Sequence, residues 1–217
     1  MSRLSDSPVV WIVKVCLRLA FVTLFWILVP GISASPALLA DEQTANRIAL
    51  TNGSIHAGDG SDPFIGHVVI RDGVIESIQT GDIPEASIRV DCTGLVIAPG
   101  FIDLHNHSDD AILHRDTRGN INYLLQGCTT VVTGNCGSGP VDVGQYLDQV
   151  DRDGAGTNIA HLLPQGSLRA RVMGPQSGRA TSEQMMTMLS LTEKAMKEGA
   201  FGISTGLIYI PGTFTET

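Results

Sequence analysis

The sequence predicts an α/β protein in which the N-terminal part of a small β-sandwich precedes a partial (β/α)8 barrel of about four strand–helix units. Three observations support this fold class. Short apolar runs separated by turn residues fill residues 41–98, apolar strands alternate with helical stretches over residues 99–217, and the chain has 217 residues in all. Strand–helix alternation builds parallel sheets. Because a complete barrel takes about 250 residues by itself, about half a barrel is expected.

Residues 1–40 have the layout of a secretory signal peptide. Positive charges at Arg3, Lys14 and Arg18 accompany an uncharged apolar run at 19–32 and small residues at 33–35. We expect cleavage after Ala40, with Ala34 as the second choice, and therefore export to the periplasm or the medium. The alternative is an uncleaved membrane anchor, but Lys14 and Arg18 interrupt the apolar stretch, and a span needs about 20 apolar residues.

The composition argues against two kinds of protein, a nucleic-acid-binding protein and a zinc ribbon. The net charge is −8, and the sequence has no basic stripe, which argues against a nucleic-acid partner. The four cysteines, Cys16, Cys92, Cys128 and Cys136, include no CxxC pair, so a zinc ribbon is excluded. A disulfide between two of the last three could form in an oxidising compartment, but for Cys92 and Cys128 we favour buried free thiols.

Residues 41–98 predict the β-sandwich strands. Two dipeptides, Asn52-Gly53 and Asp72-Gly73, each follow a short apolar run. Both suit tight hairpin turns, because their residues can take the positive φ that the two central positions of such a turn need. Two further runs, 74–78 and 88–90, continue the β pattern.

After Pro99-Gly100, four strands are expected at 101–104, 129–133, 158–163 and 200–204, the first of them buried. The helix before the last strand is well marked. Thr181 and Gln184 fit a capping box, and Gly199 suits the C-terminal end. Helical spacing places four apolar residues on one face, namely Met185, Met188, Leu189 and Met196.

The motif that carries chemistry is the pair His105 and His107, two residues apart at the end of the first barrel strand. Alternate side chains of a strand point to the same face, so both imidazoles can enter one cavity. The carboxyl ends of barrel strands are where active sites lie. We therefore expect the pair to bind one metal ion.

Cys136 follows the second barrel strand in a glycine-rich stretch, 134–139, and so lies on the same rim as the histidines. A thiolate is a strong zinc ligand, which is our preferred interpretation. A cysteine nucleophile remains an alternative if a histidine acts as its base, and so does an inert cysteine. A phosphate-binding loop is not indicated, since the phosphate-loop signatures are missing.

Three stretches, PGFIDLHNHSDD (99–110), GCTTVVTGNCGSG (127–139) and EGAFGISTGLIYIPG (198–212), resemble the D-aminoacylase (N-acyl-D-amino-acid deacylase) family of the metal-dependent amidohydrolase superfamily. The resemblance extends from about Arg47 to Thr217. Its specific element is Cys136, because this family uses a cysteine where most binuclear relatives use a carboxylated lysine. The resemblance also implies a β-sandwich made from both chain ends and packed on a distorted barrel.

The resemblance implies hydrolysis of the amide bond of N-acyl-D-amino acids with one or two Zn²⁺ ions. It implies His105, His107 and Cys136 as metal ligands, and Ser204, Thr205 and Tyr209 line the expected pocket for the small N-acyl amino acid. The two further histidines and the catalytic aspartate of the family are expected beyond Thr217. Catalytic residues within this chain are therefore unknown, and the chain alone is expected to be inactive.

Other residues near the motifs are given lesser roles. Asp109 and Asp110 are expected to be exposed loop charges, and His161 to be a core residue or a neighbour of the ligands. Two other functions remain open: another amidohydrolase, dihydroorotase-like or dipeptidase-like, and a non-catalytic remnant of a truncated gene. The DNA downstream of Thr217 would distinguish these cases, because a reading frame that continues with histidine motifs would indicate a longer enzyme interrupted by a frameshift or a gene-model error.

Overall fold

The computed structural model describes residues 9–11 and 46–216, which form two compact units divided after Pro99. The rest of the predicted leader, with both expected cleavage positions, lies outside the described residues. Within the described part of the chain, no helix has the length and apolar character needed to cross a membrane.

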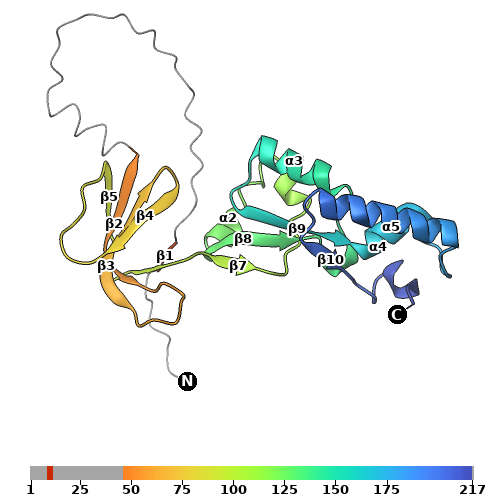
Figure 1. The fold of residues 1–217 in the computed structure, drawn as a ribbon, viewed down its shortest axis with the longest axis horizontal. Coiled ribbons are helices and arrows are strands. Elements are labelled where there is room, and N and C mark those ends of the chain that lie inside the picture. Colours follow the sequence, from red (N-terminus) through yellow and green to blue (C-terminus); the bar gives the residue numbers. More distant parts are fainter. Residues whose placement is uncertain (1–8, 12–45, 217) are drawn as a thin grey trace, which may run out of the picture. The chain divides into compact units, whose positions relative to one another are not determined.

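The first unit is one mixed sheet, ordered β1-β6-β2-β3-β4, with β5 also pairing to β2 (Figure 1). Its strands are β1 (Val9–Trp11), β2 (Arg47–Ile55), β3 (Phe64–Arg71), β4 (Val74–Gln79), β5 (Ile88–Asp91) and β6 (Val96–Ala98). The β2–β3 and β3–β4 pairs are antiparallel, and the others are parallel. Strand β1 falls within the segment predicted as a leader.

The two predicted hairpin dipeptides behave differently. Asp72-Gly73 forms the β3–β4 turn, with φ of 50° and 78°. Asn52-Gly53 does not form a turn, so that prediction is wrong: β2 runs straight through it, with a register shift next to Asn52 at φ 60°. The buried ring of His67 accepts a hydrogen bond from the Asn52 amide at 3.2 Å. A tertiary contact therefore turns the dipeptide into a β-bulge.

The core of this unit consists of Leu50, Ile55, Val68, Cys92 and Ile97. Cys92 is a fully buried free thiol, as expected, and its burial raises the pKa of the thiol. Cys128 and Cys136 are also free, and both are half-buried.

The second unit contains a parallel sheet in the order β10-β9-β8-β7, which is the partial barrel that the sequence predicts (Figure 1). Its strands are β7 (Phe101–Asp103), β8 (Cys128–Thr133), β9 (Asn158–Pro164) and β10 (Gly202–Ser204). Its helices are α2 (Ile121–Leu124), α3 (Val143–Asp153), α4 (Gln165–Met173) and α5 (Ser182–Lys197), with short 3-10 turns η1 (Ala111–Leu113), η2 (Asn135–Gly137) and η3 (Gly212–Phe214).

Two apolar clusters hold the helices against the strands. One joins Ile112, Val131, Tyr146 and Val150, and the other joins Val143, Leu163, Leu168 and Ala195. The prediction that 101–104 is a buried strand is correct for the strand and wrong for the burial. Phe101 and Ile102 are 56% and 61% exposed, because β7 pairs only with β8 among the described strands.

Helix α5 has the predicted capping box at Thr181 and Gln184. The predicted apolar face is only partly correct. Ala195 is the buried residue, and Met188 and Leu191 pack beside it. The other predicted members, Met185, Leu189 and Met196, are exposed. The helical period was readable from the sequence, whereas the packed face depends on where α5 crosses its neighbours.

Replacing Leu163 by alanine is expected to lower the free energy of unfolding by about 2 to 5 kcal/mol, the usual cost of deleting a buried leucine side chain. Leu163 is fully buried in the cluster that also contains Val143 of α3, Leu168 of α4 and Ala195 of α5. The matched control is Leu189→Ala on α5, where the side chain is 57% exposed; its effect should stay within about 0.5 kcal/mol. Denaturant unfolding of both variants measures the difference, and equal losses would contradict the assigned core.

Candidate metal centre

The three predicted metal ligands converge in the structure. His105 and His107 follow β7, and Cys136 lies in η2 just after β8, so all three stand at the carboxyl ends of neighbouring parallel strands. Their ligand atoms lie within 4.8 Å of one another. His105 Nε2 is 3.3 Å from Cys136 Sγ, and the two imidazole centroids are 5.2 Å apart.

Asn106 sets the direction of the two histidines. Its side chain is buried between them, where Nδ2 donates to Asp103 at 3.2 Å and Oδ1 accepts from the Ser108 amide at 2.8 Å. Asn106 is buried, whereas His105 and His107 on either side of it in the sequence are exposed, so both imidazoles lie on the rim. The alternation that the sequence predicted is thus fixed by hydrogen bonds of the middle residue.

Left-handed backbone turns the cysteine toward the histidines. Gly134, Cys136 and Gly137 have φ of 78°, 55° and 70°. Such conformations are open to glycine and uncommon for other residues. The glycines that flank Cys136 therefore allow the chain to reverse just after β8, so that the thiol lies beside His105.

The donor set suits zinc. Thiolate and imidazole are the ligands that Zn²⁺ takes in proteins, with bonds of about 2.3 Å and 2.0 Å. In a tetrahedral site these bond lengths put sulfur and nitrogen about 3.5 Å apart. The separation of 3.3 Å between Cys136 Sγ and His105 Nε2 agrees with that value to a few tenths of an ångström. The residues present therefore fit a zinc ion.

The sequence-based description of the carboxylates needs a correction. Asp110 is an exposed loop charge and pairs with His114 at 3.1 Å. Asp109 is not exposed: only 9% of its surface is accessible, and its Oδ1 accepts a hydrogen bond from the Gly134 amide at 2.5 Å. Adjacent aspartates in a loop look alike in sequence, and only the position of the β8–η2 turn distinguishes them.

His161 is a buried structural histidine, in line with the sequence prediction. Its Nε2 donates to the Pro140 carbonyl at 2.9 Å, which leaves Nδ1 to accept from the Thr133 hydroxyl at 2.8 Å. Burial lowers the pKa of His161, so the ring is neutral at physiological pH. Tyr146 packs on it with ring centroids 4.5 Å apart, and burial raises the pKa of Tyr146 to about 12.

A cavity of about 480 Å³ adjoins the ligands, and its lining includes His107, Cys136, Tyr209, Ile210 and Pro211. Of the three residues predicted to contact substrate, Tyr209 lines this cavity, and Thr205 and Ser204 do not line it. The Ser204 hydroxyl is buried and hydrogen-bonded to the backbone around Cys136.

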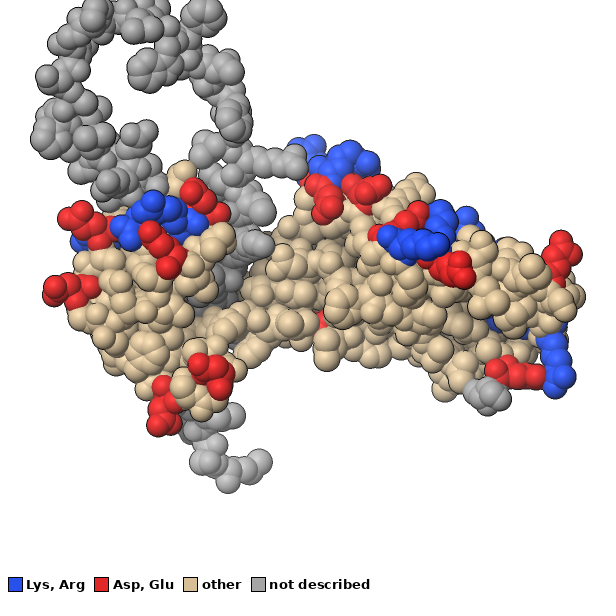
Figure 2. Space-filling view, in the orientation of Figure 1, with Lys and Arg blue, Asp and Glu red and all other residues tan. Residues whose placement is uncertain are grey.

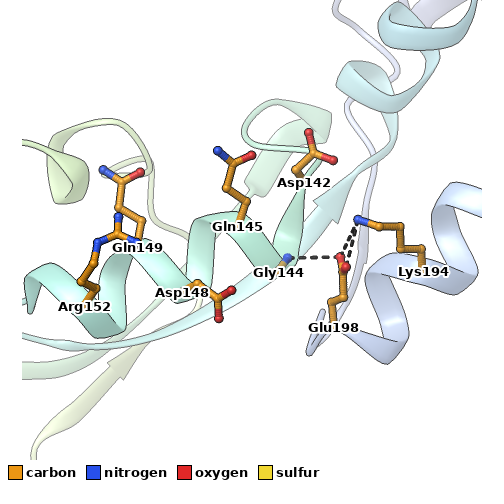
Figure 3. A pocket seen from close by; sticks show the side chains of 8 residues that line it. All are labelled: Asp142, Gly144, Gln145, Asp148, Gln149, Arg152, Lys194 and Glu198. Atoms are coloured by element: carbon orange, nitrogen blue, oxygen red, sulfur yellow. Dashed lines mark hydrogen bonds and ion pairs between the residues drawn. The ribbon is translucent and has the colours of Figure 1, made fainter.

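A second hollow of about 530 Å³ lies between α3 and α5 (Figure 3). Glu198 occupies its edge, where it pairs with Lys194 at 2.9 Å and accepts from the Gly144 amide at 3.3 Å. Figure 2 shows acidic and basic side chains side by side along these helices. Because the lining holds paired charges and neither histidine nor cysteine, this hollow offers none of the ligand chemistry of the rim.

Known proteins are similar to this chain in sequence and in fold. The D-aminoacylase of Alcaligenes xylosoxydans xylosoxydans is 35% identical over 195 residues, which cover 78% of this chain and 40% of the relative. A crystal structure of D-aminoacylase superposes with a TM-score of 0.73 at 29% identity, over 78% of this chain and 40% of that one. No family model matches the chain.

A third relative is the N-acyl-D-glutamate deacylase of Bordetella bronchiseptica, whose crystal structure holds zinc and a phosphonate mimic of the tetrahedral intermediate. It superposes with a TM-score of 0.72 at 30% identity, over 78% of this chain and 40% of that one. This chain spans about 40% of the length of the relatives it matches. By sequence and by fold, it is similar to the D-aminoacylases and the related N-acyl-D-amino-acid deacylases.

Proposed function

We propose that this chain carries the cysteine-containing metal centre of a zinc-dependent hydrolase that cleaves the amide bond of N-acyl-D-amino acids. The observation that carries the proposal is the convergence of His105, His107 and Cys136 within 4.8 Å. The names of the relatives, D-aminoacylase and N-acyl-D-glutamate deacylase, support the substrate class. The zinc in the structure of the glutamate deacylase supports the choice of ion.

The proposal gives a task to the residues of the metal centre and of the adjoining cavity. His105, His107 and Cys136 hold one or two ions; bound zinc polarises an amide carbonyl and acidifies water. Tyr209, with Ile210 and Pro211, forms the wall that contacts the N-acyl amino acid in the adjoining cavity. The buried carboxylate of Asp109 accepts from a backbone amide, and this proposal gives it no catalytic task.

We expect the product of the complete reading frame to release amino acid from N-acyl-D-amino acids much faster than from the L-enantiomers. Chelation should abolish the reaction, and added zinc should restore it, because the donor set binds zinc through a thiolate. Enantiomer-resolved assays of the amine released measure both effects. Preference for the L-enantiomer would favour a different amidohydrolase, and no turnover by zinc-loaded protein would contradict the proposal.

We also propose that the protein is exported, because residues 1–40 have the basic, apolar and small-residue order of a signal peptide. N-terminal sequencing of the protein recovered outside the cytoplasm should begin at or near Asp41. A soluble cytoplasmic protein that begins at Met1 would contradict this prediction, and a membrane-bound one that retains residues 1–40 would favour the anchor.

A further inference from the structure

Two side chains hold the backbone on both sides of Cys136. On one side, Asp109 Oδ1 accepts a hydrogen bond from the amide of Gly134 at 2.5 Å. The Ser204 hydroxyl spans the turn, because it donates to the Gly134 carbonyl before Cys136 and accepts from the Gly137 amide after it at 3.0 Å. Asp109 and Ser204 are each 9% exposed, so these bonds are shielded from competing water.

The turn that carries Cys136 needs such support. Cys136 has φ 55° and ψ 25°, a left-handed conformation that is unfavourable for a residue with a Cβ. Backbone held in such a region persists where its surroundings over-determine it. Without its anchors, the turn would relax toward a more favourable conformation, and the thiol would move away from His105.

The two anchors come from different parts of the barrel unit. Asp109 lies two residues after His107, so its bond to Gly134 ties the loop of the histidines to the loop of the cysteine. Ser204 ends β10 and reaches back to the turn after β8. Together they fix the thiol relative to the imidazoles, and neither anchor is among the clustered ligand residues.

We propose that Asp109 and Ser204 are positioning residues that hold the Cys136 thiolate at the metal centre. This assigns Ser204 a role on the backbone instead of the contact with substrate that its sequence position suggested. The proposal rests on the proposed function in one respect, namely that Cys136 is a metal ligand.

The test compares metal binding by the parent protein with that of the Asp109→Ala and Ser204→Ala variants. Competition with a chromophoric chelator measures the affinity for Zn²⁺, and the thiolate-to-metal charge-transfer band of bound Co²⁺ reports whether the thiolate is bound to the metal. Each alanine variant should bind zinc about 10- to 100-fold more weakly, the usual effect of losing a group that orients a ligand. At saturating cobalt, the charge-transfer band should be weakened. The matched control is Asp110→Ala, which removes an exposed neighbouring carboxylate and should leave both readouts unchanged.

Conservative variants separate positioning from charge and from folding. Asp109→Asn keeps an oxygen that can accept from Gly134, and Ser204→Thr keeps the hydroxyl, so both should retain most of the zinc affinity and the cobalt band. Unfolding of the metal-free proteins identifies any variant that does not fold. If a variant at Asp109 or Ser204 fails to fold, the variants at the other of these two positions are used to test the proposal. Alanine variants that bind zinc like the parent protein would overturn the proposal, and so would Asp109→Asn losing as much affinity as Asp109→Ala. A parent protein without a thiolate band would instead overturn the metal centre itself.

Discussion

In the full-length enzyme that the proposed function implies, replacement of Cys136 by alanine is expected to remove zinc and nearly all of the hydrolytic activity. The thiol is the only sulfur ligand among the clustered residues, and it lies 3.3 Å from His105. Because removal of a group that merely orients a ligand already costs about 10- to 100-fold in metal affinity, removal of the ligand itself should cost more. Metal content after dialysis and turnover of the zinc-loaded protein measure the two losses.

Cys128→Ala is the matched control. Cys128 begins β8, whereas Cys136 follows the other end of the same strand, and both cysteines are free and half-buried. The control variant should keep its zinc and most of its activity. If the two alanine variants behave alike, Cys136 is not a metal ligand.

Replacement of Gly134 by alanine should have a large effect on stability. Gly134 has φ 78°, and a Cβ there would lie 2.1 Å from the carbonyl oxygen of Leu162. The left-handed conformation alone costs a residue with a Cβ about 1 to 2 kcal/mol, and the clash with backbone adds to it. We expect a loss of more than about 3 kcal/mol in the free energy of unfolding, with weaker zinc binding.

Gly73→Ala separates the two contributions. Gly73 has the same φ, 78°, in the β3–β4 turn, but a Cβ at this position meets nothing within 4 Å. Its substitution should cost about 1 to 2 kcal/mol, the conformational penalty without the clash. Denaturant unfolding of both variants gives the difference, and similar losses would show that the approach of Leu162 is not what requires glycine at 134.

Much of this site was readable from the sequence because its signals are local. His105 and His107 follow an apolar strand, and Cys136 follows the next strand along the chain. In a parallel sheet such positions meet at one edge, so convergence follows from order and spacing. The capping box of α5 and the Asp72-Gly73 turn are likewise local, since their hydrogen bonds join residues a few positions apart.

Other features depended on contacts between residues distant in sequence. Asn52-Gly53 has the composition of a hairpin turn, but the ring of His67 and the side chain of Ile97 hold it within β2. Asp109 and Asp110 look equivalent in the sequence. In the fold, Asp109 is buried and hydrogen-bonded to the Gly134 amide, whereas Asp110 is exposed.

The sequence by itself therefore determined the α/β class, the half-barrel order of strands and the choice of three candidate ligand residues, because periodicity, turn chemistry and strand order are properties of short segments. Only the tertiary structure decided which aspartate is buried, which face of α5 packs, and that the Ser204 hydroxyl serves the Cys136 turn. Those outcomes depend on how separate strands and helices approach one another, since a buried polar group must find its hydrogen-bond partner wherever the fold places one.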